Sequence, residues 1–318
     1  MDSAPSTGAV YVRSIAYVLG RILPIADALV DRGPPDLLAK LLAAGFRSYS
    51  VSELSAPRLA REALAATLTR SERSASSIDA VVYATCSFWG DSVGELHRAS
   101  IHRDVLAPLG LDHVALHGVG LAESGNFASA LRTARNLLRC GDARNVLVVT
   151  TDRVPNRTEE YRAMPSAVTI NSDGAAACLV SSEPGAGFEL EEVAQVSSPK
   201  MLLHRKGEGL QKYLEIVAGL RAAFDAVRRR LAVRAEDYAA LVTNNYAPAT
   251  LANFAQAVGV VPERVFIDNV ARFGHAFAAD NLINIDDLCR SGGLRKGDRL
   301  LALSTGPLTW GAVSLRQC

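Results

Sequence analysis

Short apolar runs alternate along this chain with longer segments of helical period. Four runs are apolar on both faces, which is typical of strands in a parallel sheet covered by helices on both sides. These runs are residues 80–84 (AVVYA), 146–150 (VLVVT), 240–243 (ALVT) and 300–304 (LLALS). The alternation of such strands with helical segments predicts an α/β architecture.

Two of the helical segments are long enough to predict helices. In residues 126–140, apolar side chains recur at spacings of three, four and seven, with arginines at the other positions. Gly141 follows this segment and is a suitable residue to end a helix. Residues 210–233 have a second, longer helical pattern.

An internal repeat divides the chain into two similar parts. A glycine opens a helical pattern at Gly125 and again at Gly274, and a glycine-containing turn and an apolar strand follow each. Each unit also has an upstream strand that ends in small polar residues. Four features in the same order favour a duplicated fold, although any two βα units share some likeness. We therefore expect an N-terminal half at residues 1–185 and a C-terminal half at residues 186–318.

Composition and charge narrow the class of protein. With 34 Lys and Arg against 33 Asp and Glu, the net charge of +1 argues against a dedicated binder of nucleic acid. No apolar run approaches the roughly 18–20 residues of a membrane span, and no secretory signal is visible. The five cysteines are scattered, with no C-x-x-C pair, so neither disulfides nor a metal site is expected. These features predict a cytoplasmic protein with no nucleic-acid or membrane partner.

Four segments resemble the ketoacyl-acyl-carrier-protein synthase III family of the thiolase fold. They are residues 121–131 (LAESGNFASAL), 171–180 (NSDGAAACLV), 265–282 (VFIDNVARFGHAFAADNL) and 304–311 (STGPLTWG). The resemblance implies a five-layered α-β-α-β-α core made of two duplicated halves. It also implies a homodimer with no bound cofactor, whose acyl donor is carried on the phosphopantetheine of an acyl carrier protein or of coenzyme A.

Three positions depart from the family pattern. Ser124 occupies the position of the family's nucleophilic cysteine, and Asn244 occupies the position of its histidine. The family's Gly-Asn-Thr segment has become Gly274-His275-Ala276. The usual Cys-His-Asn set therefore becomes Ser-Asn-His, and a different reaction is expected.

A serine hydroxyl needs an adjacent general base, usually a histidine oriented by a carboxylate. His275 and Asp280 supply one of each. Residues five apart do not share a helix face, so the two can meet only if His275 lies in the turn before the helix that carries Asp280. Family members with this G-H-x-x-x-x-D pattern look like acyltransferases rather than condensing enzymes, and some share the serine.

The predicted function is therefore acyl transfer from a carrier-protein or coenzyme A thioester, through acyl-Ser124, to a small-molecule hydroxyl or amine or to a second thiol. Family analogy suggests a setting in polyketide or other secondary metabolism. Two alternatives stay open. One is a priming condensing synthase, and the other is a catalytically silent partner subunit that binds acyl groups.

Each candidate residue also has a structural interpretation. Ser124 could cap the following helix, and His275 could be a hydrogen-bonded core residue. Asp280 could pair with Arg272, and Asn244 could be a turn residue instead of a hydrogen-bond donor in the site. Cys86 follows a strand and is an alternative nucleophile, although most buried cysteines are inert.

An oxyanion hole needs backbone N–H groups aimed at the developing charge. The Ser124 N–H is one candidate. Pro307 aligns with the family's second donor but has no N–H, so either Gly306 or Leu308 replaces it or the oxyanion hole is weakened. A carboxylate at Glu123 would disfavour the oxyanion, so we expect this side chain to face away from the site.

Basic residues are candidates for docking a carrier protein or a coenzyme A phosphate, although an arginine run on a helix is often a solvated face. The candidates are Arg205, Lys206, Arg228, Arg229, Arg230 and Arg264.

Overall fold

A computed structural model describes residues 8–28, 35–86, 99–154, 162–164, 166–204 and 209–318. Nine strands form one mixed sheet. In spatial order they are β5 (Ala115–Val119), β4 (Ala80–Ala84), β6 (Asn145–Asp152), β7 (Gly174–Ser181), β1 (Tyr11–Leu19), β8 (Phe188–Ser197), β11 (Thr309–Gln317), β10 (Arg299–Thr305) and β9 (Tyr238–Val242).

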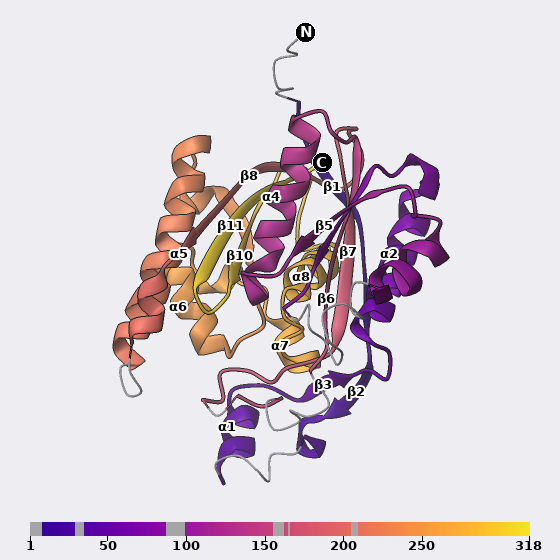
Figure 1. The fold of residues 1–318 in the computed structure, drawn as a ribbon. Coiled ribbons are helices and arrows are strands. Elements are labelled where there is room, and N and C mark those ends of the chain that lie inside the picture. The colour runs from indigo at the N-terminus through magenta and orange to yellow at the C-terminus, as the bar shows by residue number, and fades with distance from the viewer. Residues whose placement is uncertain (1–7, 29–34, 87–98, 155–161, 165, 205–208) are drawn as a thin grey trace.

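The helices lie in three layers around this sheet (Figure 1). α2 packs outside β1, β6 and β7, α5 packs outside β8 and β11, and α4 and α8 lie between the two parts of the sheet. The helices are α1 (Leu37–Ala43), α2 (Ala56–Ser71), α4 (Asn126–Arg139), α5 (Gly209–Leu231), α6 (Pro248–Val258), α7 (Asp268–Phe273) and α8 (Ala279–Arg290). The predicted α-β-α-β-α layering is confirmed.

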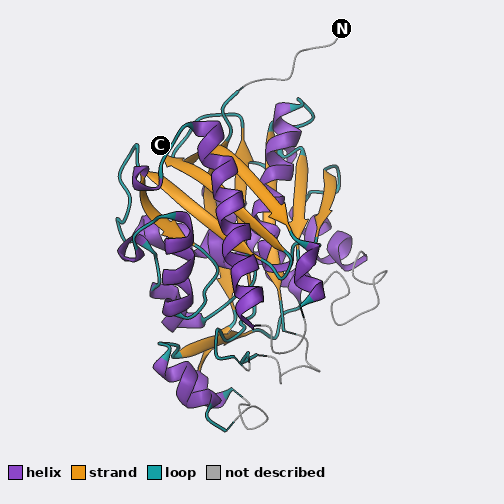
Figure 2. Ribbon diagram, turned by 90° about the vertical axis from the view of Figure 1, so that its left-hand side faces the viewer, coloured by secondary structure: helices purple, strands orange, loops and turns teal. Residues whose placement is uncertain are grey.

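A second, small sheet lies at the base of the molecule (Figure 2). It pairs β2 (Arg21–Pro24) with β3 (Ser48–Val51) in antiparallel register, and α1 lies beside it. The four predicted strands are present as β4, β6, β9 and β10, and the two predicted helices are α4 and α5.

Strand order and direction repeat between the two parts of the sheet. In the first part, β4 and β6 are parallel neighbours and β7 and β1 follow in antiparallel order. In the second part, β9 and β10 are parallel and β11 and β8 follow in antiparallel order. The two parts join through a short β1–β8 pairing at Tyr11 and Val12. Residue 185, where we divide the chain, lies in the turn between β7 and β8, and the division into two domains stays a prediction.

The central helices give the fold its functional geometry. α4 and α8 both pack into the apolar core between the two parts of the sheet, through residues such as Phe127, Leu131 and Ile283. Ser124 lies just before the start of α4, and His275 lies just before the start of α8. The duplicated fold therefore places corresponding turns of the two halves next to each other.

The outer helix α5 approaches the sheet unusually closely at Gly219. A Cβ atom on Gly219 would lie 2.1 Å from Cε3 of the buried Trp310 ring on β11. Any side chain there must displace either the indole or the helix. The close approach of α5 to β11 therefore depends on glycine at this position.

We predict that Gly219→Ala destabilises the protein by about 1–3 kcal/mol, because overpacking a buried contact forces neighbouring groups to move. The matched control is Gly209→Ala on the same helix, where an added Cβ meets no atom within 4 Å. Urea unfolding of both variants measures the two changes in the free energy of unfolding. An equal effect in both variants would show that the close contact with Trp310 is unimportant.

Candidate active site

Ser124 lies in η6 (Glu123–Gly125), a short 3-10 turn that leads into α4. Glu123 has a left-handed backbone, with φ of +48°, which is uncommon for a residue other than glycine. The Ser124 side chain does not cap α4; its hydroxyl forms a 3.0 Å hydrogen bond with Nε2 of His275. Both side chains are buried. The local turn therefore directs Ser124 toward the second half of the fold.

His275 is held in place by its backbone and by two aromatic rings. Its N–H donates to Ile170 O at 2.8 Å, and its carbonyl accepts the Ser172 N–H at 2.8 Å. The rings of Tyr246 and Phe277 lie on the imidazole with centroid distances of 5.2 and 5.3 Å. These contacts fix the position and the plane of the imidazole.

Asp280 is completely buried and accepts a hydrogen bond from His275 Nδ1. It also accepts the N–H groups of Ala276 at 2.7 Å and Asn245 at 2.8 Å. The expected placement of the two residues is confirmed, since His275 lies in the turn before α8 and Asp280 lies in the first turn of α8. Asp280 does not pair with Arg272, whose partner is Asp287 at 2.6 Å.

These contacts define the proton positions in the Ser124–His275–Asp280 chain. A carboxylate is an acceptor only, so the Nδ1–H of His275 donates to Asp280. Nε2 of the neutral imidazole is then an acceptor, and it faces the Ser124 hydroxyl. The arrangement is that of a nucleophile, a base and an orienting carboxylate.

Asn244 joins the two halves of the site through the backbone. Its Nδ2 group donates to Ser124 O at 3.3 Å and to Phe277 O at 3.0 Å, and its Oδ1 accepts the Thr305 N–H at 2.8 Å. Asn244 is therefore a hydrogen-bond donor in the site, as expected, and the acceptors of its two amide hydrogens are backbone carbonyls. Asn244 is a positioning residue in this structure.

A cavity of about 760 Å³ opens over Ser124 and His275. Its wall is mostly apolar, with contributions from the segment before β7 and from α5, α6 and β11. The apolar wall residues include Met164, Ala167, Val168, Ile216, Phe254 and Trp310. Glu123 and Lys212 line the same cavity. The cavity can hold an apolar chain whose reactive end reaches the Ser124 hydroxyl.

Cys86, just after β4, lies beside both Ser124 and Asp152, the last residue of β6. Asp152 Oδ1 accepts the Cys86 N–H at 2.7 Å and the Thr85 hydroxyl at 2.9 Å, while its buried Oδ2 has no hydrogen-bond partner among the described residues. Burial, together with the charge of Asp152, raises the pKa of the Cys86 thiol well above its usual value. A neutral thiol is a poor nucleophile, so this environment favours Ser124 over Cys86.

The backbone N–H groups expected to form the oxyanion hole differ in whether they already have a hydrogen-bond partner and in whether their residues border the cavity. The Gly306 N–H already donates to Thr309 O at 2.7 Å, so Gly306 is not a free donor and this expectation is wrong. Gly306 instead packs against the Ser124 turn, where an added Cβ would lie 2.1 Å from Ala122 O. Pro307 borders the cavity that holds Ser124, whereas Leu308 is not among its described lining residues. The N–H of Ser124, at the turn into α4, stays a prediction.

The docking arginines that the structure describes, Arg228, Arg229, Arg230 and Arg264, are not among the lining residues of the cavity. Arg228 pairs with Asp225, and Arg264 donates to the backbone carbonyls of Glu236 and Tyr238. Arg228 and Arg229 lie about 24 Å along α5 from Lys212, at the end away from the cavity.

Of the remaining docking candidates, only Arg230 lies within the described residues. Arg230 forms an ion pair with Glu192 at 3.2 Å, whereas Arg205 and Lys206 lie outside the described residues.

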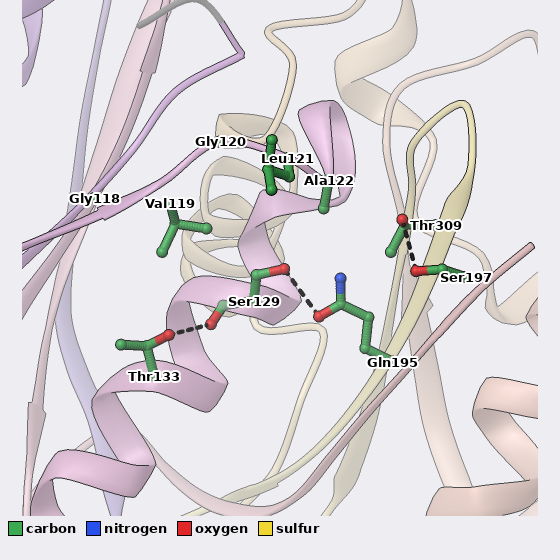
Figure 3. Close-up of a pocket in the computed structure, with 10 residues that line it drawn as sticks. All are labelled: Gly118, Val119, Gly120, Leu121, Ala122, Ser129, Thr133, Gln195, Ser197 and Thr309. Atoms are coloured by element: carbon green, nitrogen blue, oxygen red, sulfur yellow. Dashed lines mark hydrogen bonds between the residues drawn. The ribbon is translucent and has the colours of Figure 1, made fainter. Parts of the chain in front are cut away.

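A smaller hollow of about 340 Å³ is lined by residues 118–122, which precede the Ser124 turn, and by residues of α4, β8 and β11 (Figure 3). Ser129 on α4 donates to Gln195 Oε1 on β8 at 2.9 Å across it. Leu121 borders this hollow and is fully exposed.

Some residues of the site carry signals that the sequence interpretation did not use. Asp152 is a carboxylate at the end of an apolar strand, and Asn245 and Tyr246 come shortly after the end of another strand. Polar groups at the carboxyl ends of parallel strands often belong to sites.

Within the described ranges, no cluster of three or more His, Cys, Asp or Glu side chains is arranged to bind a metal. None of the described helices has both the length and the apolar character needed to cross a membrane.

Comparison with protein families gives two matches in the order of the chain. Residues 122–198 match the family described as 3-oxoacyl-[acyl-carrier-protein] synthase III, and residues 229–317 match the C-terminal part of the same family. Together the two matches cover about half of the 318 residues. The first match includes Ser124, and the second includes His275 and Asp280.

Similar proteins extend the likeness over most of the chain. The β-ketoacyl-[acyl-carrier-protein] synthase III of Synechococcus sp. (strain WH7803) is 28% identical over 295 residues, covering 86% of this chain and 85% of that protein. The synthase III structure from Aquifex aeolicus VF5 has a TM-score of 0.77 at 20% identity, covering 96% of this chain and 99% of that one. The structure of ChlB3, described as an acyltransferase, has a TM-score of 0.82 at 18% identity, covering 97% of this chain and 98% of that one.

Asp152 gives a pH-dependent prediction. Burial raises its pKa from 3.8 to about 7, so between these values the folded protein keeps a proton that the unfolded chain releases. This contribution to stability is complete below pH 4 and is lost as the pH rises through 7. Relative to Asp152→Asn, wild-type protein should lose about 3 kcal/mol of unfolding free energy between pH 5 and pH 8.

Urea unfolding at several pH values measures this difference. The control is Asp142→Asn, which removes a carboxylate from an exposed turn. A constant difference between wild type and Asp152→Asn across this pH range would contradict a neutral buried carboxyl.

Proposed function

Since the chain belongs to the 3-oxoacyl-[acyl-carrier-protein] synthase III family of the thiolase superfamily, we propose that it is an acyltransferase with a serine nucleophile. The observation that carries the proposal is the buried chain of hydrogen bonds from Ser124 through His275 to Asp280. Family membership supports acyl transfer from a thioester, and the triad supports transfer through an ester on Ser124. The condensing reaction is the alternative within the family.

The first half-reaction forms the acyl-enzyme. Nε2 of His275 takes the proton from the Ser124 hydroxyl as Oγ attacks the thioester carbonyl carbon. The tetrahedral intermediate collapses as the carbon–sulfur bond breaks, and the leaving thiolate takes the proton from the imidazolium. Asp280 holds the reactive tautomer and stabilises the imidazolium while it carries the extra proton.

The second half-reaction restores the serine. An acceptor hydroxyl, amine or thiol loses its proton to Nε2 of His275 and attacks the ester carbon of acyl-Ser124. Oγ then leaves and regains a proton from the imidazolium. The same base therefore serves both halves of the cycle, with the acceptor occupying the place that the donor thiol has left.

The cavity supports an acyl donor on a phosphopantetheine arm. Its apolar wall suits an uncharged acyl chain, while Lys212 supplies a positive charge on α5 that suits a phosphate. In this proposal the arm belongs to an acyl carrier protein or to coenzyme A. The likeness to ChlB3, described as an acyltransferase, supports a non-condensing reaction, and a role in polyketide or other secondary metabolism is part of this proposal.

Two observations weigh against the alternatives. Decarboxylative condensation needs neutral donors for the enolate oxygen, and both amide hydrogens of Asn244 bond to backbone carbonyls instead. A silent binding subunit gives no reason for a complete hydrogen-bonded triad at the end of an acyl-sized cavity.

We predict a covalent acyl adduct on Ser124 after incubation with an acyl thioester. Intact-mass spectrometry should show the added acyl mass, and peptide mapping should place it within residues 121–131. Ser124→Ala should abolish the adduct, while Ser129→Ala on α4, outside the cavity that holds Ser124, should retain it. A carbon–carbon product from a malonyl-carrier donor would favour the condensing enzyme, and an adduct on Cys86 would replace Ser124 as nucleophile.

We also propose that the chain forms a homodimer, as the family resemblance implies. β5 is an edge strand with β4 as its neighbour, and the nearby Leu121 is a fully exposed apolar side chain. An open strand edge and an exposed leucine are both favourable for pairing with a second copy.

Light scattering at micromolar concentration should give twice the mass of one chain. Leu121→Asp should lower this mass toward that of a monomer, while Leu202→Asp, at another exposed leucine, should not. A wild-type monomer at this concentration would refute the dimer.

A further inference from the structure

Glu123 is the residue immediately before Ser124, and its position contradicts the expectation that it faces away from the site. It is exposed to solvent and lines the same cavity as Ser124 and His275. Burial is the main reason why the pKa values of the Cys86 thiol and the Tyr246 hydroxyl are raised, and the negative charge of Glu123 raises both further. Cys86 and Tyr246 both lie beside the Ser124–His275 pair, so the Glu123 carboxylate lies on the reactive side of the turn.

The carboxylate of Glu123 is not neutralised by a described neighbour. No described residue forms an ion pair or a side-chain hydrogen bond with it, and partial burial raises its pKa. The other charged side chain among the described lining residues, apart from the triad histidine, is Lys212 on α5. The left-handed backbone of Glu123 also fixes the direction in which its side chain leaves the turn.

A carboxylate beside the nucleophile raises the barrier of the proposed reaction, because its charge disfavours the oxyanion that forms when Ser124 attacks the thioester carbonyl carbon. A residue that opposes the chemistry in this way needs a compensating role. Like charges at close range repel each other, and the cavity wall of low polarity strengthens this repulsion. The Glu123 carboxylate therefore discriminates between acyl donors according to the charge that the acyl group carries near the thioester.

We propose that Glu123 is a charge filter: it selects neutral acyl groups and rejects acyl groups that carry a free carboxylate, such as malonyl. A malonyl group bound for attack by Ser124 places its carboxylate two carbons from the reacting carbonyl, within the field of Glu123. A neutral acyl chain of the same size meets the apolar wall of the cavity without that repulsion. This inference rests on the proposed acyl transfer and names the class of donor.

The test compares two coenzyme A thioesters with equal numbers of heavy atoms in the acyl group, malonyl and acetoacetyl. Single-turnover acylation of Ser124, followed by intact-mass spectrometry, gives a rate for each donor. Wild type should favour acetoacetyl, and Glu123→Gln should reduce this preference about tenfold. Glu123→Lys should reduce it further. Because Glu123 is exposed, the preference of wild type should also weaken at high ionic strength.

The control is Glu236→Gln, which removes the same charge from an exposed turn outside the cavity and should leave the ratio of the two rates unchanged. An unchanged ratio in Glu123→Gln, or an equal change in Glu236→Gln, overturns the charge filter.

A binding measurement separates this outcome from failure of the proposed function. In a Ser124→Ala background, which cannot be acylated, Glu123→Gln should increase the affinity for malonyl-coenzyme A relative to acetoacetyl-coenzyme A. No acylation of wild type by either donor would refute the acyltransferase, while the affinity ratio would still decide the role of Glu123.

Discussion

The hydrogen bond between His275 and the buried Asp280 carboxylate is the interaction on which the site depends. A buried carboxylate is costly unless it is fully hydrogen-bonded, and here the backbone N–H groups of Ala276 and Asn245 share that role with the imidazole. The same carboxylate therefore shapes the turn before α8 and orients the base. Structural and catalytic requirements are combined in a single side chain.

The duplicated fold explains why these residues can meet. Ser124 and His275 are 151 positions apart in sequence, yet each lies in the turn before the central helix of its own half. Packing of α4 and α8 in one core between the two parts of the sheet brings those turns together. Asn244 and Gly306 then tie the Ser124 turn to the second half through backbone contacts, so small changes at either residue should alter the distance between Ser124 and His275.

Much of this could be predicted from the sequence, because the relevant signals are local. The apolar runs identify the strands, and the five-residue spacing of His275 and Asp280 requires a turn before a helix. The role of Asn244 could not be predicted, since its partners Phe277 and Thr305 come from different elements. The engagement of the Gly306 N–H likewise depends on the closure of the β10–β11 hairpin, which a residue type does not reveal.

The most direct test of the account is the rate of Ser124 acylation in Asp280→Asn, His275→Ala and the double variant, each measured per folded molecule. Loss of the orienting carboxylate favours the wrong tautomer, and such losses reach about 10⁴-fold in serine triads. We expect a loss of that order in Asp280→Asn, a comparable loss in His275→Ala, and little further loss in the double variant. Acylation by folded Asp280→Asn at the wild-type rate would contradict the triad and would leave Asp280 with only a structural role.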